Sequence, residues 1–194
     1  FVVTDLDGNS YVSAYAYPDQ MHLVIMAFDP TGEIMWQTQL RDITQYANLT
    51  CKLNHDGVLV IFGVAHYNWI WNPLLVMVRI SDGHVMSQNK IEVETRDYHK
   101  MAIDLDNNIY LAGSEEGDYY GRVVLTKFNS TADCIWRRTL SLDGSMTASD
   151  ITVSNDSIFL QCVADTNGAR AMIILKIDTD AVNTYTPFGV TVDY

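Results

Sequence analysis

Two short acidic stretches have the residue types of a calcium-binding loop: Asp5-x-Asp7-x-Asn9 and Asp104-x-Asp106-x-Asn108. An EF-hand loop also requires glycine at its sixth position and glutamate at its twelfth, and neither stretch has both. Asp and Asn side chains in tight turns accept hydrogen bonds from the backbone a few residues further on. We therefore interpret both stretches as turns, and we predict no metal site.

Residues for acid–base or nucleophilic catalysis are sparse. Glu115, Glu116 and Asp118 gather in one loop, but a general acid needs burial or a close like charge to raise its pKa. The sequence favours a solvated acidic loop. The five histidines do not cluster at metal-ligand spacing, and no catalytic serine, metalloprotease or phosphate-binding motif is present. We predict no catalytic residue and no cofactor.

Aromatic residues alternate with other residues between Tyr67 and Asn72. One interpretation is that two strands continue into a longer hairpin, with the aromatic rings packed on a neighbouring sheet. The other is an exposed platform for a sugar ring or a protein partner, because Tyr and Trp combine large contact area with a polar tip. The candidate binding residues come from this stretch and two related loops: Tyr17, Tyr67, Trp69, Trp71, Tyr119 and Tyr120.

The sequence that flanks these loops consists of four internal repeats, which must position them. A turn pair recurs as Asp7-Gly8, Asp56-Gly57, Asp106-Asn107 and Asn155-Asp156, at spacings of 49, 50 and 49 residues. The position of Trp36 recurs as Ser87, Trp136 and Tyr185, at spacings of 51, 49 and 49 residues. An apolar run followed by a polar turn separates the two in every copy. A period of this length with strand-like patterning indicates a repeat architecture.

Each copy is expected to form four short strands. In the third copy we predict strands over about 100–105, 109–113, 122–128 and 134–140. The third strand of each copy is apolar on both faces, as expected between neighbouring sheets, whereas the fourth is polar enough for an outer edge. Cys134 and Cys162 lie in apolar strand patterns and are expected to be small buried residues.

The pattern D-x-D-G-N-x-Y, followed by an apolar strand, a D-P-T-G turn and Trp36, resembles the β-propeller repeat of many extracellular proteins. The resemblance is clearest in the first and third copies. It implies an all-β β-propeller of four repeats of about 49 residues, each a four-stranded antiparallel blade. We place the blades at 1–46, 47–96, 97–146 and 147–194 of a single propeller domain or propeller segment. Four blades that close on themselves are favoured over a part of a larger ring.

Net charge and hydropathy exclude some classes of binding partner. The formal net charge is −12 and the twelve basic residues are scattered, which argues against nucleic acid. No apolar run is long enough for a membrane span. The chain opens at Phe1 inside a strand pattern, so we expect a processed or excised piece. Three sequons place candidate N-glycosylation sites at Asn48, Asn129 and Asn155 and favour an extracellular or secreted protein.

These observations lead to one functional hypothesis and one alternative. The hypothesis is a non-enzymatic extracellular binding or assembly module. It would use the loop face opposite the turns between the first and second strands, for a protein or glycan partner, for self-assembly or for association with further blades. The alternative is a fragment of a glycan-processing or quinoprotein-like propeller enzyme with a site at the central channel. The apolar first strands, such as Met101-Ala102-Ile103, favour the hypothesis.

Overall fold

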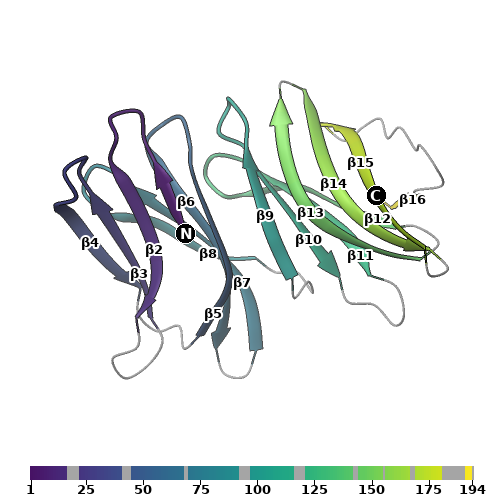
Figure 1. Ribbon diagram of the computed structural model, residues 1–194, viewed down its shortest axis with the longest axis horizontal. Helices are drawn as coiled ribbons and strands as arrows, with labels where there is room; N and C mark the ends of the chain where they lie inside the picture. The colour runs from purple at the N-terminus through teal and green to yellow at the C-terminus, as the bar shows by residue number, and fades with distance from the viewer. Residues whose placement is uncertain are drawn as a thin grey trace. The chain divides into compact units, whose positions relative to one another are not determined.

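The computed structural model is all-β, and it describes residues 1–16, 22–40, 45–67, 70–91, 97–115, 121–141, 144–154, 156–166, 169–180 and 191–193. The strands of these residues form four antiparallel sheets, which confirms the prediction of an all-β repeat fold (Figure 1). No helix in the described part of the chain is long and apolar enough to cross a membrane. The chain divides into two compact units, Phe1–Val93 and Glu94–Tyr194.

Unit 1 contains two sheets of four strands each, in sequential order. Sheet 1 consists of β1 (Val2–Thr4), β2 (Ser10–Ala16), β3 (His22–Phe28) and β4 (Ile34–Leu40). Sheet 2 consists of β5 (Gln45–Leu53), β6 (Val58–Tyr67), β7 (Ile70–Arg79) and β8 (Val85–Lys90). Side chains from both sheets form one core, with Leu23, Ile25, Leu59 and Ile61 almost fully buried.

Unit 2 repeats this plan with a different ending. Sheet 3 consists of β9 (Asp97–Ile103), β10 (Ile109–Glu115), β11 (Arg122–Phe128) and β12 (Cys134–Ser141), close to the strands predicted for the third copy. Sheet 4 consists of β13 (Ser145–Ser154), β14 (Ser157–Thr166) and β15 (Ala169–Asp178). The core is built around Tyr110, Leu125, Ile158 and Leu160.

The last strand, β16 (Thr191–Asp193), pairs antiparallel with β12 and extends sheet 3 to five strands. β12 is therefore not the outer edge strand that its polar sequence predicted. The fourth strand expected around Tyr185 lies outside the described residues.

The apolar sequences of the third strands explain the layering. Consecutive residues of β3, β7 and β11 are buried, and one face of each strand contributes to the core of its unit. The fourth strand of sheet 2 alternates instead: β8 is exposed at every second residue.

The prediction for Cys134 is wrong. Cys162 is fully buried, and burial raises the pKa of its thiol to about 12, whereas Cys134 is exposed. Cys134 is the first residue of β12, where the register with β11 shifts and Cys134 lies opposite Phe128. The same shift in sheet 1 places the exposed Ile34 opposite Phe28, so this position faces solvent in both copies.

Candidate functional site

The acidic stretch Asp5–Asn9 is a tight turn held by one carboxylate. One oxygen of Asp5 accepts hydrogen bonds from the backbone N–H of Asp7 at 3.0 Å and of Asn9 at 2.9 Å. The other oxygen accepts the Asn9 amide at 2.9 Å and the Tyr11 hydroxyl at 2.8 Å. Burial acts to raise the pKa of Asp5, but these hydrogen bonds outweigh it and lower that pKa below its usual value.

The third copy repeats this network atom for atom. Asp104 accepts the backbone N–H groups of Asp106 and Asn108 at 3.0 and 2.8 Å, and the side chains of Asn108 and Tyr110 at 2.8 and 2.9 Å. Each carboxylate is thus the acceptor for four protein donors. Turn formation accounts for both acidic stretches, as the sequence indicated.

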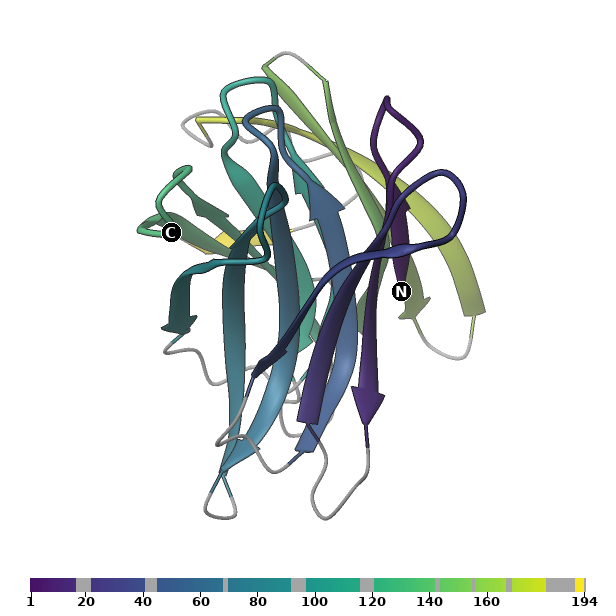
Figure 2. The ribbon, with the colours of Figure 1, turned by 90° about the vertical axis from the view of Figure 1, so that its left-hand side faces the viewer.

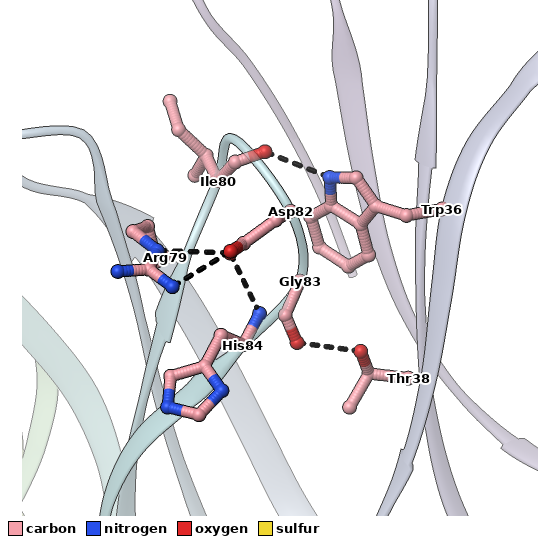
Figure 3. Close-up of polar contacts among 7 residues, drawn as sticks. All are labelled: Trp36, Thr38, Arg79, Ile80, Asp82, Gly83 and His84. Carbon is pink, nitrogen blue, oxygen red and sulfur yellow. Dashed lines mark hydrogen bonds and ion pairs between the residues drawn. The ribbon is translucent and has the colours of Figure 1, made fainter.

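A polar clasp joins the two sheets of unit 1 at the turn between β7 and β8 (Figure 3). The indole Nε1–H of Trp36 on β4 donates to the carbonyl of Ile80 at 2.7 Å. The hydroxyl of Thr38, two residues along the same strand, donates to the carbonyl of Gly83 at 2.6 Å. Trp36 also packs against Tyr11, with ring centroids 6.0 Å apart. The tryptophan is therefore a packing and hydrogen-bonding residue.

The turn that receives Trp36 is stiffened by an ion pair. Arg79 donates two hydrogen bonds to Asp82, at 2.9 and 2.6 Å, and the same carboxylate accepts the backbone N–H of His84 (Figure 3). The bonds from Arg79 and His84 lower the pKa of Asp82 to about 2. Both side chains of the pair are about half exposed, so the pair orders the turn more than it stabilises the fold.

Gly83 makes this close approach possible. Its φ is +72°, in the left-handed region that side chains disfavour. A Cβ at this position would lie 2.5 Å from Cε3 of Trp36 and 2.8 Å from the hydroxyl oxygen of Thr38. Ser81-Asp82-Gly83 was expected as a polar turn, aligned with the turn that ends at Gly32, but its contact with Trp36 was not predicted.

Unit 2 repeats the tryptophan bond of this clasp, with a cationic side chain added. Trp136 donates to the carbonyl of Thr179 at 3.2 Å, and the Lys127 ammonium donates to the same carbonyl at 3.3 Å. Lys127 also lies over the Tyr110 ring, 5.3 Å from its centroid. Lys127 pairs with Trp136 across the strands, where Ala27 pairs with Trp36 in sheet 1.

Two of the six candidate binding residues, Tyr67 and Trp71, lie on described strands. Tyr17, Trp69, Tyr119 and Tyr120 lie outside the described residues. The backbones of Tyr67 and Trp71 are in β6 and β7, where the pairs Tyr67–Ile70 and His66–Trp71 end a hairpin of two ten-residue strands. The strands do continue into a longer hairpin, as one of the two interpretations held. β2 and β6 end on the same side of unit 1 (Figure 2).

Among the candidate glycosylation sites, Asn129 has a structural role that the sequence analysis missed. Its side-chain oxygen accepts the backbone N–H of Thr131 and of Asp133, and its amide donates to the Asp133 carboxylate at 3.0 Å. Asp29 makes the matching backbone bonds in the first copy. Alignment of Asn129 with Asp29 was the available signal. Asn48 is within β5, and Asn155 lies outside the described residues.

Within the described ranges, no group of three or more His, Cys, Asp or Glu side chains could hold a metal ion. Of the acidic loop, Glu116 and Asp118 lie outside the described residues, and Glu115 ends β10.

Comparisons with known proteins match structures and no sequence family. No family model matches the chain, and no curated protein matches it. Among solved structures, it is similar to an ACO/RPE65 chimera, with a TM-score of 0.48 and 11% identity over 98% of this chain and 47% of that one. It is also similar to the tail fiber of a Staphylococcus aureus phage, with a TM-score of 0.36 and 10% identity over 89% of this chain and 48% of that one. The chain spans about half the length of each.

Proposed function

We propose that the chain is a non-enzymatic binding or assembly module made of β-propeller-type repeats, and that it acts outside the cell. The observation that carries the proposal is the use of its repeated polar residues. The carboxylates of Asp5 and Asp104 and the indoles of Trp36 and Trp136 are bound to turns of the chain itself. The recurrent motif is therefore scaffold, and recognition falls to the loops that differ between copies.

The end of the β6–β7 hairpin is the part of the scaffold best suited to present a ligand-binding surface. The two strands are paired along ten residues, so the backbone of the last pair, Tyr67 and Ile70, is held by a continuous ladder. Tyr67 and Trp71 are in the last two pairs, and Trp69 stands between them in the sequence. Aromatic side chains stack on the apolar faces of sugar rings and anchor protein interfaces. We propose a glycan or protein partner for this end of unit 1.

The test is a paired substitution at the tip. Trp69→Ala with Trp71→Ala is expected to weaken binding in a glycan array and in calorimetric titration of the best glycan by at least about tenfold, because aromatic anchors carry most of the energy of such sites. The matched control is Leu6→Ala with Leu105→Ala, two exposed apolar residues on the β1–β2 and β9–β10 turns. Unchanged binding by a correctly folded tip variant would refute the glycan proposal.

The proposed location outside the cell rests on the sequons. If it holds, secretion of the chain from a eukaryotic cell should add glycans that an amidase removes, and the mass shift should disappear when the sequons are removed. A secreted chain whose mass equals that of the bare polypeptide would contradict the glycoprotein part of the proposal.

A further inference from the structure

One face of sheet 4 is apolar and exposed. Leu160, Leu175 and Ile177 belong to the core of unit 2, so the residues that alternate with them lie on the opposite face of β14 and β15. We call this face the front of sheet 4; its residues are Phe159, Gln161, Val163, Met172, Ile174 and Lys176. Met172 is 69% exposed and Ile174 is 66% exposed. Several large apolar side chains exposed together mark a surface that another element covers.

The front of sheet 4 copies the face of sheet 3 that packs on sheet 4. Each of its residues stands 49 positions after a residue of sheet 3: Tyr110, Ala112, Ser114, Val123, Leu125 or Lys127. Tyr110 and Val123 belong to the core that sheets 3 and 4 share. The strand register is also the same, because Tyr110 pairs with Lys127 and Phe159 pairs with Lys176. The front of sheet 4 therefore has the sequence and the register to pack on one more sheet.

Lys176 repeats the cation that binds the following sheet in unit 2. Lys127 lies over the Tyr110 ring and donates to the carbonyl of Thr179, on the turn after β15, at 3.3 Å. Lys176 is likewise opposite an aromatic residue, Phe159, and it is exposed. Among the residues that the structure describes, none accepts a hydrogen bond from its ammonium. Lys176 is thus a donor in place for a carbonyl on a further sheet.

Sheet 1 has the matching apolar surface. Alternate residues of its first three strands pack in the core of unit 1, and the residues between them form the opposite face, which we call the back of sheet 1. The apolar residues of this back are Val2, Val12, Ala14, Val24, Met26 and Phe28. Val12 pairs with Met26 as Leu160 pairs with Leu175, two residues by which sheet 4 packs in the core of unit 2. Val2 is 63% exposed, so this back has apolar surface left to cover.

Sheet 1 also has a carbonyl at the place that Lys176 requires. Ile80 and Thr179, whose carbonyls accept the tryptophan bonds, come directly after β7 and β15. Pro30 holds the same place in sheet 1, because in both turns the preceding residue, Asp29 or Arg79, donates its N–H to the carbonyl that closes the turn. Pro30 is exposed. A sheet that packed on the back of sheet 1 would therefore find an acceptor at this turn.

From these two faces we propose that copies of the chain associate head to tail. The front of sheet 4 of one copy packs on the back of sheet 1 of the next, and Lys176 of the first donates to the Pro30 carbonyl of the second. The partner is a second copy because the chain itself carries both matching faces. The contact is heterologous, since the two copies use different surfaces, and it forms a ring where the rotation closes and a filament otherwise. The inference rests on the assembly role proposed above and assigns that role a surface.

Two charged substitutions at exposed positions test the contact by complementation. Ile174→Arg places a charge on the front of sheet 4, and Val2→Arg places one on the back of sheet 1. Each variant alone should associate at least about tenfold more weakly than the wild-type chain in analytical ultracentrifugation, because the contact would bury an unpaired charge. An equimolar mixture should form a heterodimer, since the Val2→Arg chain keeps its front and the Ile174→Arg chain keeps its back. Met86→Arg, at an exposed position on β8 outside both faces, should associate as the wild-type chain does.

The complementation separates this contact from association through any other surface. Wild-type affinity in either variant alone would overturn the proposal. So would a mixture that stays monomeric although both variants have the circular dichroism spectrum of the wild-type chain. A monomeric wild-type chain would overturn it too, and if that chain still bound a glycan at the end of the β6–β7 hairpin, the binding role would stand without the head-to-tail contact.

Lys176→Met tests the polar part of the contact. It removes the ammonium and keeps most of the alkyl stem, so association should weaken by about fivefold, as expected for the loss of one hydrogen bond. Unchanged affinity would overturn the bond from Lys176 to the Pro30 carbonyl.

Discussion

Replacing Gly83 with alanine is the most direct test of the clasp in unit 1. The new Cβ would be placed 2.5 Å from Cε3 of Trp36 and 2.8 Å from the Thr38 hydroxyl oxygen, closer than any real Cβ contact. The neighbours are a bulky ring and a short side chain, both held by hydrogen bonds to the same turn. Either the ring or the turn must therefore move.

The expected cost has two parts. A non-glycine residue at a φ of +72° costs about 1–2 kcal/mol. Overpacking against the Trp36 ring adds about 1–3 kcal/mol. Gly32→Ala provides the matched control, because Gly32 has a φ of +89° and open space around the position of a Cβ. That variant should lose only the conformational part, so the two variants should differ by about 1–3 kcal/mol.

Urea denaturation followed by tryptophan fluorescence and by circular dichroism would measure both variants. A double-mutant cycle sharpens the test, because in a Trp36→Ala background the ring that Gly83→Ala would strike is gone. In that background Gly83→Ala should cost less than it does in the wild-type chain, because only the 2.8 Å contact with the Thr38 hydroxyl oxygen remains. The steric argument is wrong if Gly83→Ala and Gly32→Ala destabilise the wild-type chain equally.

Three further outcomes follow from the turn networks. Burial and the bond to Asp5 raise the pKa of Tyr11 to about 12, against about 10 in the unfolded chain. The free energy of unfolding should therefore fall between pH 10 and pH 12, because the unfolded state loses the Tyr11 proton first. Tyr11→Phe should make this fall shallower in alkaline unfolding curves. Asp5→Ala leaves four donors without their acceptor and should lower the free energy of unfolding by about 2–3 kcal/mol. EDTA should leave the melting midpoint of the wild-type chain unchanged. A downward shift of that midpoint with EDTA would restore the calcium interpretation. Asn129→Asp keeps the acceptor oxygen that Asp29 supplies and removes a sequon, but it replaces the amide that donates to Asp133 with a second carboxylate, so it should cost part of what Asn129→Ala costs, which is about 1–2 kcal/mol. Equal losses for the two variants would show that the side-chain oxygen is not what holds the turn.

The strands and their turns could be predicted from sequence because their signals are local. The Asp5 network lies within the seven residues Asp5–Tyr11, and the third copy contains its own turn residues and apolar strands. The clasp could not be predicted in this way. Trp36 and Ile80 are 44 residues apart, and nothing near Trp36 specifies which carbonyl its indole reaches.

Two other features depended on pairing that a sequence does not display. An apolar strand pattern suggested burial for Cys134, but the register shift opposite Phe128 leaves its side chain in solvent. β16 pairs with β12 through three residues, from Thr191 to Asp193, and so short a segment carries no pattern that selects a partner. For the candidate binding residues, alternation left a longer hairpin and an exposed aromatic platform open; the longer hairpin is present in β6 and β7, and strand periodicity was its local signal.

The tryptophan bond of the clasp occurs at every second sheet: sheets 1 and 3 have it. Trp36 and Trp136 each bind the turn of the following sheet, but β8 has Ser87 at the same position. The Ser87 hydroxyl oxygen is buried and has no hydrogen-bond partner among the described residues. A buried hydroxyl without a partner is unfavourable, so Ser87→Ala should be neutral or stabilise the chain by up to about 1 kcal/mol in urea denaturation. Thr38→Ala, which removes a hydroxyl bonded at 2.6 Å, should instead destabilise it by about 1–2 kcal/mol. If Ser87→Ala lowers the free energy of unfolding as much as Thr38→Ala does, the Ser87 hydroxyl has a partner, and the inference that the network repeats only at every second sheet is wrong.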